Sequence, residues 1–166
     1  GALFYAAFNL RLFFFLLFRK ADVLVSNDLD TLLANYSAKL FKPKTRLVYD
    51  SHEYFTEVPE LQGRFAKKVW EKIEAFIFPK LTTIYTVNTS IADLYQKKYG
   101  KILYVVRNVS PLWQVTNLLS KKELNLPEDK PLIILQGAGI NVDRGGEEAV
   151  TAMQYIENGY LIIVGD

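Results

Sequence analysis

The stretch Leu47-Val48-Tyr49-Asp50-Ser51-His52-Glu53 joins a short apolar run to four consecutive polar residues. This pattern is typical of a buried strand whose carboxyl end opens into a loop. His52 is the only histidine of the chain, and carboxylates precede and follow it at Asp50 and Glu53. Ligands of open α/β sheets bind outside the carboxyl ends of the strands, so this stretch is the first candidate for a functional site. The alternative is that His52 is an ordinary hydrogen-bonded surface group.

Strand-like and helical patterns alternate on both sides of this stretch. We expect strands at 22–26, 46–51, 82–87 and 102–106, and helices at 29–41, 64–78 and 91–99. The alternation predicts an α/β fold with a parallel sheet. The strands read as continuous apolar runs, which predicts helices on both faces of the sheet.

Capping residues and an apolar face support the predicted helices. Asn27-Asp28 and Ser90 are expected to cap two helix starts, and Gly100 to end the last helix. The predicted apolar face of the helix 64–78 consists of Phe65, Val69, Ile73, Phe76 and Ile77.

The segment 2–18 is strongly apolar but is a poor membrane span, because it is short and carries Asn9 and Arg11 near its middle. It also lacks the basic start and the cleavage site of a secretory signal. We expect a helix packed between a sheet and other elements. The alternative is a helix on a membrane surface, with Arg19 and Lys20 at its end.

Composition excludes several classes of site. Half of the residues are hydrophobic, so a substantial core is expected. The absence of cysteine excludes disulfides and thiolate chemistry and fits a cytoplasmic location, and the single histidine excludes a multi-histidine zinc site. A net charge of +2 is too small to indicate nucleic acid as a partner.

The chain is predicted to hold parts of two domains. Residues 109–131, with three prolines, are predicted to be a linker between a first domain at 1–108 and a second at 132–166. The second domain is expected to begin with a strand at 132–136, a helix at 147–156 and a strand at 160–164. Gly1 and the strand-like end indicate a fragment of a longer protein, with both domains incomplete.

A glycine-rich loop, residues 137–146, follows the first strand of the second domain. It fits the dinucleotide fingerprint badly, because Val142 stands in the place of the third glycine, and it lacks the Gly-Lys-Ser/Thr of a P-loop. Arg144 stands directly before the predicted helix, where a guanidinium can hold a diphosphate. The alternative is an ordinary loop with a solvated arginine.

Taken together, these segments resemble a known family. The segments are ADVLVSNDLDTLL (21–33), LVYDSHEYFTEVPEL (47–61), TIYTVNTSIADLY (83–95), VVRNVSP (105–111), LQGAGINVDRGGEEAVTAM (135–153) and LIIVGD (161–166). In order and spacing they resemble glycosyltransferases of the family-4, GT-B type, over residues 20–166. The resemblance implies two Rossmann-like domains with parallel sheets covered by helices, facing a cleft. It also implies a nucleotide-sugar donor held mainly by the second domain, a polysaccharide or glycolipid acceptor, and transfer with retention of configuration, usually without a metal.

The resemblance assigns roles to particular residues. His52 matches the catalytic histidine near the transferred sugar, and Asn108 the asparagine that ends the last strand before the linker. Arg144 and Gly145 match the basic-glycine pair on the donor diphosphate, and Gly137 the glycine after the first strand of domain two. The arginine that often follows that glycine is replaced by Ala138. The first-domain glycine-rich loop and the Glu-x7-Glu segment of the family are not among these residues.

These assignments suggest a mechanism. Arg144 and the helix start would stabilise the departing diphosphate, and His52 would position substrate hydroxyls and not attack them. Asp50 and Glu53, which with Asn108 would line the cleft, would orient His52 or hold the turn. The chain alone is expected to be inactive, and to self-associate through unpaired strand edges.

Two alternative functions stay open. One is a nucleotide- or phosphate-binding module without chemistry. The other is an interaction protein at a membrane surface, attached through the segment 2–18 and the basic helix 64–78. Both alternatives are compatible with a transferase that works at the inner face of the membrane on a lipid-linked acceptor.

Overall fold

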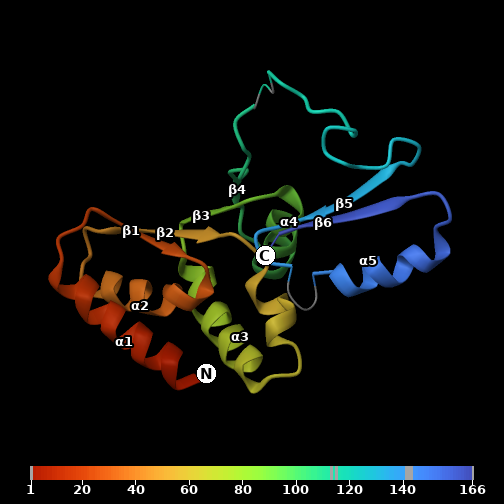
Figure 1. Cartoon of the computed structure of the whole chain (residues 1–166). Coiled ribbons are helices and arrows are strands. Elements are labelled where there is room, and N and C mark those ends of the chain that lie inside the picture. The colour runs from red at the N-terminus through yellow and green to blue at the C-terminus, as the bar shows by residue number, and fades with distance from the viewer. Residues whose placement is uncertain (1, 113, 115, 141–143, 166) are drawn as a thin grey trace. The chain divides into compact units, whose positions relative to one another are not determined.

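The computed structural model describes residues 2–112, 114, 116–140 and 144–165. The chain forms two compact units, Gly1–Val109 and Ser110–Asp166, each of which contains its own sheet (Figure 1).

The first unit alternates helices and strands as the sequence predicts. Its elements are α1 (Ala2–Phe18), β1 (Val23–Asn27), α2 (Leu29–Leu40), β2 (Arg46–Ser51), α3 (Phe65–Ile77), β3 (Thr83–Thr86), α4 (Thr89–Tyr99) and β4 (Tyr104–Val105), with short 3-10 turns at Phe55–Glu57, Pro59–Leu61 and Phe78–Lys80. The four strands form one parallel sheet in the order β1-β2-β3-β4. The predicted α/β fold with a parallel sheet is therefore confirmed, and it is compatible with a Rossmann-like fold.

The prediction that helices cover both faces of the sheet is wrong for the described part of the chain. Leu24, Tyr49 and Ile84 are buried on one face, whereas Val23 and Val25 on the other face are 47% and 48% exposed. The strand order gives the reason. Each strand is added on the same side of its predecessor, so right-handed crossovers place the connecting helices on one face (Figure 1).

Helix α1 lies outside α2 and is not packed between a sheet and other elements, so that prediction is also wrong. The Asn9 side chain donates a hydrogen bond to the Asp30 carbonyl at 2.8 Å and accepts one from the Ala34 backbone N–H at 3.2 Å. The outer side of α1 leaves Phe4 and Phe18 exposed. Within the residues that the structure describes, none of the helices combines the length and apolar character that crossing a membrane requires.

The buried face of α3 differs from the predicted one. Ile77 is buried as predicted and Ile73 is partly buried against the core, but Phe65 and Phe76 are 80% and 61% exposed, and Trp70 and Glu74 are buried in their place. The apolar periodicity could not identify this face, because a carboxylate lies at its centre. Glu74 is buried because other side chains donate hydrogen bonds to it from α4, an arrangement that a pattern within α3 cannot reveal.

The helix α4 begins at Thr89, two residues before the predicted start at 91. Asn88, and not Ser90, is the N-cap, and its side-chain oxygen accepts a hydrogen bond from the Ile91 N–H at 2.9 Å. Gly100 ends the helix as predicted, at φ 66° in the left-handed region.

The second unit contains a β-α-β segment. It consists of β5 (Leu132–Gln136), α5 (Gly146–Ala152), a 3-10 turn (Met153–Tyr155) and β6 (Tyr160–Val164), and the two strands are parallel. The Gly137 N–H donates to the Val164 carbonyl at 3.1 Å and so extends the ladder. A Cβ at Gly165 would lie 2.1 Å from the Gly137 carbonyl oxygen, so this turn requires glycine at 165.

Candidate functional site

The carboxyl ends of the first three strands fix the backbone around His52. The parallel register places Asn27 beside Asp50, and Asp50 beside Tyr85. The Asp28 N–H donates to the Asp50 carbonyl at 2.8 Å, and the Thr86 hydroxyl donates to the Ser51 carbonyl at 2.7 Å. The end of β2 is thus held from both neighbouring strands.

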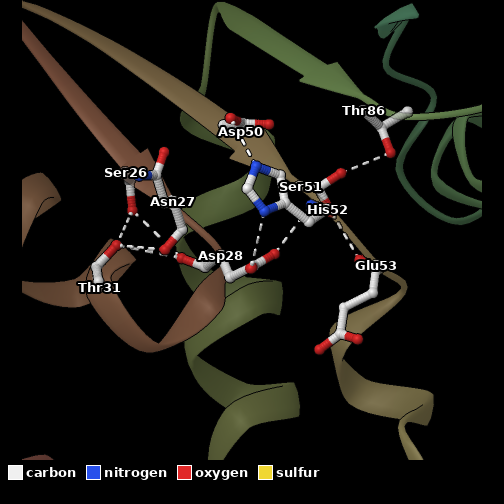
Figure 2. Close-up of polar contacts among 9 residues, drawn as sticks. All are labelled: Ser26, Asn27, Asp28, Thr31, Asp50, Ser51, His52, Glu53 and Thr86. Carbon is white, nitrogen blue, oxygen red and sulfur yellow. Dashed lines mark hydrogen bonds and ion pairs between the residues drawn. The ribbon is translucent and has the colours of Figure 1, made fainter. Parts of the chain in front are cut away.

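The His52 imidazole lies between two carboxylates (Figure 2). Its Nε2 is 2.9 Å from Asp50 Oδ2, and its Nδ1 is 3.7 Å from Asp28 Oδ2. The His52 backbone N–H donates to the other oxygen of Asp28 at 2.9 Å. The imidazole is nevertheless 55% exposed, so a ligand has access to it. We call Asp28, Asp50 and His52 the His52 cluster.

Asp28 is the residue of this cluster that the sequence analysis missed. It was predicted to help cap a helix, and it is the N-cap of α2, but its side chain makes no capping hydrogen bond. Its backbone has φ 56° and ψ 173°, a region that residues other than glycine rarely adopt. The only sequence signal was an Asp at a strand-to-helix junction, and that signal equally predicts a cap.

The surroundings of the cluster raise the pKa values of His52 and Asp28. The hydrogen bond to Asp50 raises the pKa of His52, the charges of Asp50, Asp28 and Glu53 add to this effect, and partial burial opposes it. The pKa of Asp28 is also raised, because its burial outweighs the stabilising hydrogen bond from the His52 N–H and the charge of the imidazole. The folded cluster therefore favours a proton on His52.

The geometry leaves one ring nitrogen available to a ligand. Nε2 is engaged by Asp50 at hydrogen-bonding distance, whereas 3.7 Å from Nδ1 to Asp28 is too long for a hydrogen bond. A ligand oxygen near Nδ1 could therefore accept a hydrogen bond from the protonated ring.

The Glu53 backbone carbonyl takes part in the turn after β2. The Ser51 hydroxyl donates to the Glu53 carbonyl at 2.8 Å, which tightens the turn after β2. Figure 2 shows the Glu53 carboxylate directed away from the imidazole. The hydrogen bond to the Glu53 carbonyl supports the role of holding the turn.

The other predicted site residues lie outside this cluster. Asn108 follows β4 in the first unit and is exposed, and Gly137, Arg144 and Gly145 belong to the second unit. Gly145, at φ 81°, precedes α5, and Arg144 is exposed without a hydrogen bond or ion pair to another described residue. Residues 141–143 of the predicted anion-binding loop, including Val142, lie outside the described residues.

A metal site does not emerge from the described part of the chain, where no three His, Asp or Glu side chains are grouped to hold an ion. Comparison with known proteins gives no assignment: no protein-family model and no curated protein matches the chain.

Proposed function

We propose that this chain belongs to a retaining glycosyltransferase that moves a sugar from a nucleotide-sugar donor to a polysaccharide or glycolipid acceptor. The resemblance of its segments to glycosyltransferases of the family-4 type is the starting point. The observation that carries the proposal is the His52 cluster: a half-exposed imidazole, fixed by two carboxylates, at the carboxyl end of a parallel sheet. Such an edge is where α/β proteins bind ligands.

In this proposal His52 binds substrate oxygens and does not act as a nucleophile. An attacking imidazole needs an unprotonated nitrogen that faces the substrate, but Asp50 engages Nε2 and the nearby carboxylates favour a protonated ring. A protonated ring suits a hydrogen-bond donor that orients a sugar hydroxyl close to the anomeric carbon.

Arg144 is proposed to bind the donor diphosphate. The bond from the anomeric carbon to the diphosphate breaks during transfer, and the negative charge that develops on the leaving group requires fixed positive groups. Arg144 is exposed and unpaired among the described residues, so its guanidinium is available to a phosphate. No metal is required in this scheme, because the guanidinium supplies the positive charge.

The test is nucleotide-sugar hydrolysis and sugar transfer by the full-length protein. Substituting His52→Ala or Arg144→Ala is expected to lower kcat/KM by about 100-fold or more, the usual effect of removing one donor that stabilises developing charge. Arg46→Ala is the matched control, because Arg46 is an exposed arginine at the opposite end of β2. This control should retain the wild-type rate.

Two results would contradict the proposal. Nucleotide binding without any turnover, equal in the wild type and in His52→Ala, would support a nucleotide- or phosphate-binding module. Turnover that neither substitution lowers would place the chemistry elsewhere in the protein.

A further inference from the structure

Asp28 makes two different contacts with one residue. One carboxylate oxygen accepts the His52 backbone N–H at 2.9 Å, and the other faces the ring Nδ1 at 3.7 Å. Its own N–H meanwhile donates to the Asp50 carbonyl at 2.8 Å. Asp28 therefore fixes the backbone of His52 and places a negative charge beside its ring.

The conformation of Asp28 does not serve the helix that it begins. The N-cap of α4, Asn88, has an extended backbone and a side-chain capping bond, whereas Asp28 has a left-handed φ and no capping bond. Strained backbone of this kind persists where the surrounding structure holds it, and it concentrates at functional sites. The Asp28 carboxylate therefore contacts His52 and does not cap α2.

The two carboxylates determine which nitrogen of His52 carries a proton. Asp50 accepts at 2.9 Å, so Nε2 is the protonated nitrogen of the neutral ring. In that form the Nδ1 lone pair would face the negative charge of Asp28. Protonation of Nδ1 replaces this repulsion with attraction, so the two carboxylates favour the ring form in which both nitrogens carry hydrogen.

We infer that Asp28 is a positioning residue that, together with Asp50, holds His52 as a cationic hydrogen-bond donor, whose Nδ1–H makes no hydrogen bond within the described residues and can be donated to an oxygen of the ligand. The identity of that ligand, a sugar hydroxyl or a phosphate oxygen of the donor, rests on the proposed function. The protonation state and the tautomer of His52 do not.

The charged groups that interact with the His52 ring all raise its pKa, and the neighbouring titratable groups interact with Asp28 or Asp50 and not with the ring. Asp28 at the β1–α2 junction, Asp50 on β2 and Glu53 after β2 all stabilise the imidazolium. Asp30 interacts with Asp28, and the Tyr85 hydroxyl on β3 interacts with Asp50. None of these groups is a cation that would compete with His52.

The experiment is an NMR titration of the imidazole, which a single histidine makes unambiguous. The wild-type pKa should lie above the usual value of about 6.5. Asp50→Asn should lower it most, because it replaces a charged hydrogen-bond acceptor, and Asp28→Asn should lower it less. Asp93→Asn, a change at an exposed aspartate on α4, should leave the pKa unchanged.

The ring ¹⁵N shifts test the tautomer at high pH. The neutral ring should be protonated at Nε2 in the wild type, and this preference should weaken in Asp50→Asn. Asp28→Asn keeps an oxygen for the His52 backbone N–H and so retains the fold. A purely structural Asp28 would therefore leave the titration unaffected in this variant.

An unchanged His52 pKa in Asp28→Asn, or a neutral ring protonated at Nδ1, would overturn the inference. If the proposed function were wrong and the inference right, the titration shifts would be as expected, but the protein would not turn over a nucleotide sugar. In a transferase, Asp28→Asn should also move the alkaline limb of the kcat/KM profile to lower pH, since His52 would lose its proton earlier.

Discussion

Two of the carboxylate clusters in the first unit differ in burial and in backbone strain. In the Glu74 cluster (Glu74, Tyr95, Lys98, Tyr99), the carboxylate is fully buried and accepts hydrogen bonds from Tyr95 and Tyr99 at 3.2 and 2.7 Å, and from Lys98 at 2.7 Å. In the His52 cluster the imidazole is half exposed and Asp28 adopts a strained backbone. Both clusters join elements that are distant in the sequence.

The difference separates a cluster that stabilises the packing of two helices from a cluster that is open to a ligand. Three donors surround the Glu74 carboxylate, so it joins α3 to α4 and leaves little for a ligand to bind. The His52 cluster leaves Nδ1 without a hydrogen bond at an accessible edge, and maintains a backbone strain that an inert turn would not need. Exposure and an unengaged nitrogen thus identify the candidate site better than the number of charges does.

Glu74→Ala should have the largest effect on stability. It removes the common acceptor and leaves the Tyr95 hydroxyl buried without this partner, so the free energy of unfolding is expected to fall by about 3 kcal/mol. Urea denaturation monitored by circular dichroism measures this loss.

Glu71→Ala on the same helix is the control for Glu74, and should change stability by less than about 0.5 kcal/mol because Glu71 is not in the buried cluster. A similar small change in Glu74→Ala would show that the buried cluster does not stabilise the packing of α3 on α4.

Substitutions at Asp28 should have an intermediate effect that depends on the backbone. Both Asp28→Ala and Asp28→Gly lose the acceptor for the His52 N–H, but only glycine adopts φ 56° without strain. The glycine variant is therefore expected to be more stable than the alanine variant by about 1 kcal/mol. Urea denaturation of the two variants gives the difference.

Asp22 provides a matched pair for this comparison, since it lies just before β1 and outside the left-handed region. There Asp22→Gly should be no more stable than Asp22→Ala. If glycine stabilised both positions equally, the strain at Asp28 would not be specific to the site.

The pH dependence of stability should show the smallest effect. The pKa of His52 is raised in the folded state, so its contribution is fully present below about pH 6.5 and is lost as the pH rises through the folded pKa. The ring is exposed and screened, so the loss should be less than about 1 kcal/mol. Unfolding free energies at pH 6 and above pH 8 measure it.

His52→Gln should remove this pH dependence, because glutamine does not titrate. If the unfolding free energy of the wild type instead rose with pH relative to that of His52→Gln, the two carboxylates would not stabilise the imidazolium in the folded state.

Much of the fold could be predicted from the residues, and most of the errors have one physical origin. Strand β2 has its predicted bounds, and Gly100 ends α4, because apolar runs and left-handed caps are local properties. The burial of Trp70 and Glu74 on α3 and the single covered face of the sheet were not predicted, because both depend on partners distant in the chain. A buried Glu74 is satisfied only by residues of another helix.

By itself, the sequence determined the parallel α/β class and placed His52 at the carboxyl end of a strand beside Asp50, because strand periodicity and a polar strand end are encoded in neighbouring residues. Only the tertiary structure decided that Asp28, twenty-four residues earlier in the chain, also holds His52. The parallel pairing of β1 with β2 brings their ends together, and the left-handed backbone at Asp28 turns its carboxylate from the helix to the imidazole. Neither the pairing of β1 with β2 nor the backbone angle of Asp28 can be predicted from the type of a single residue.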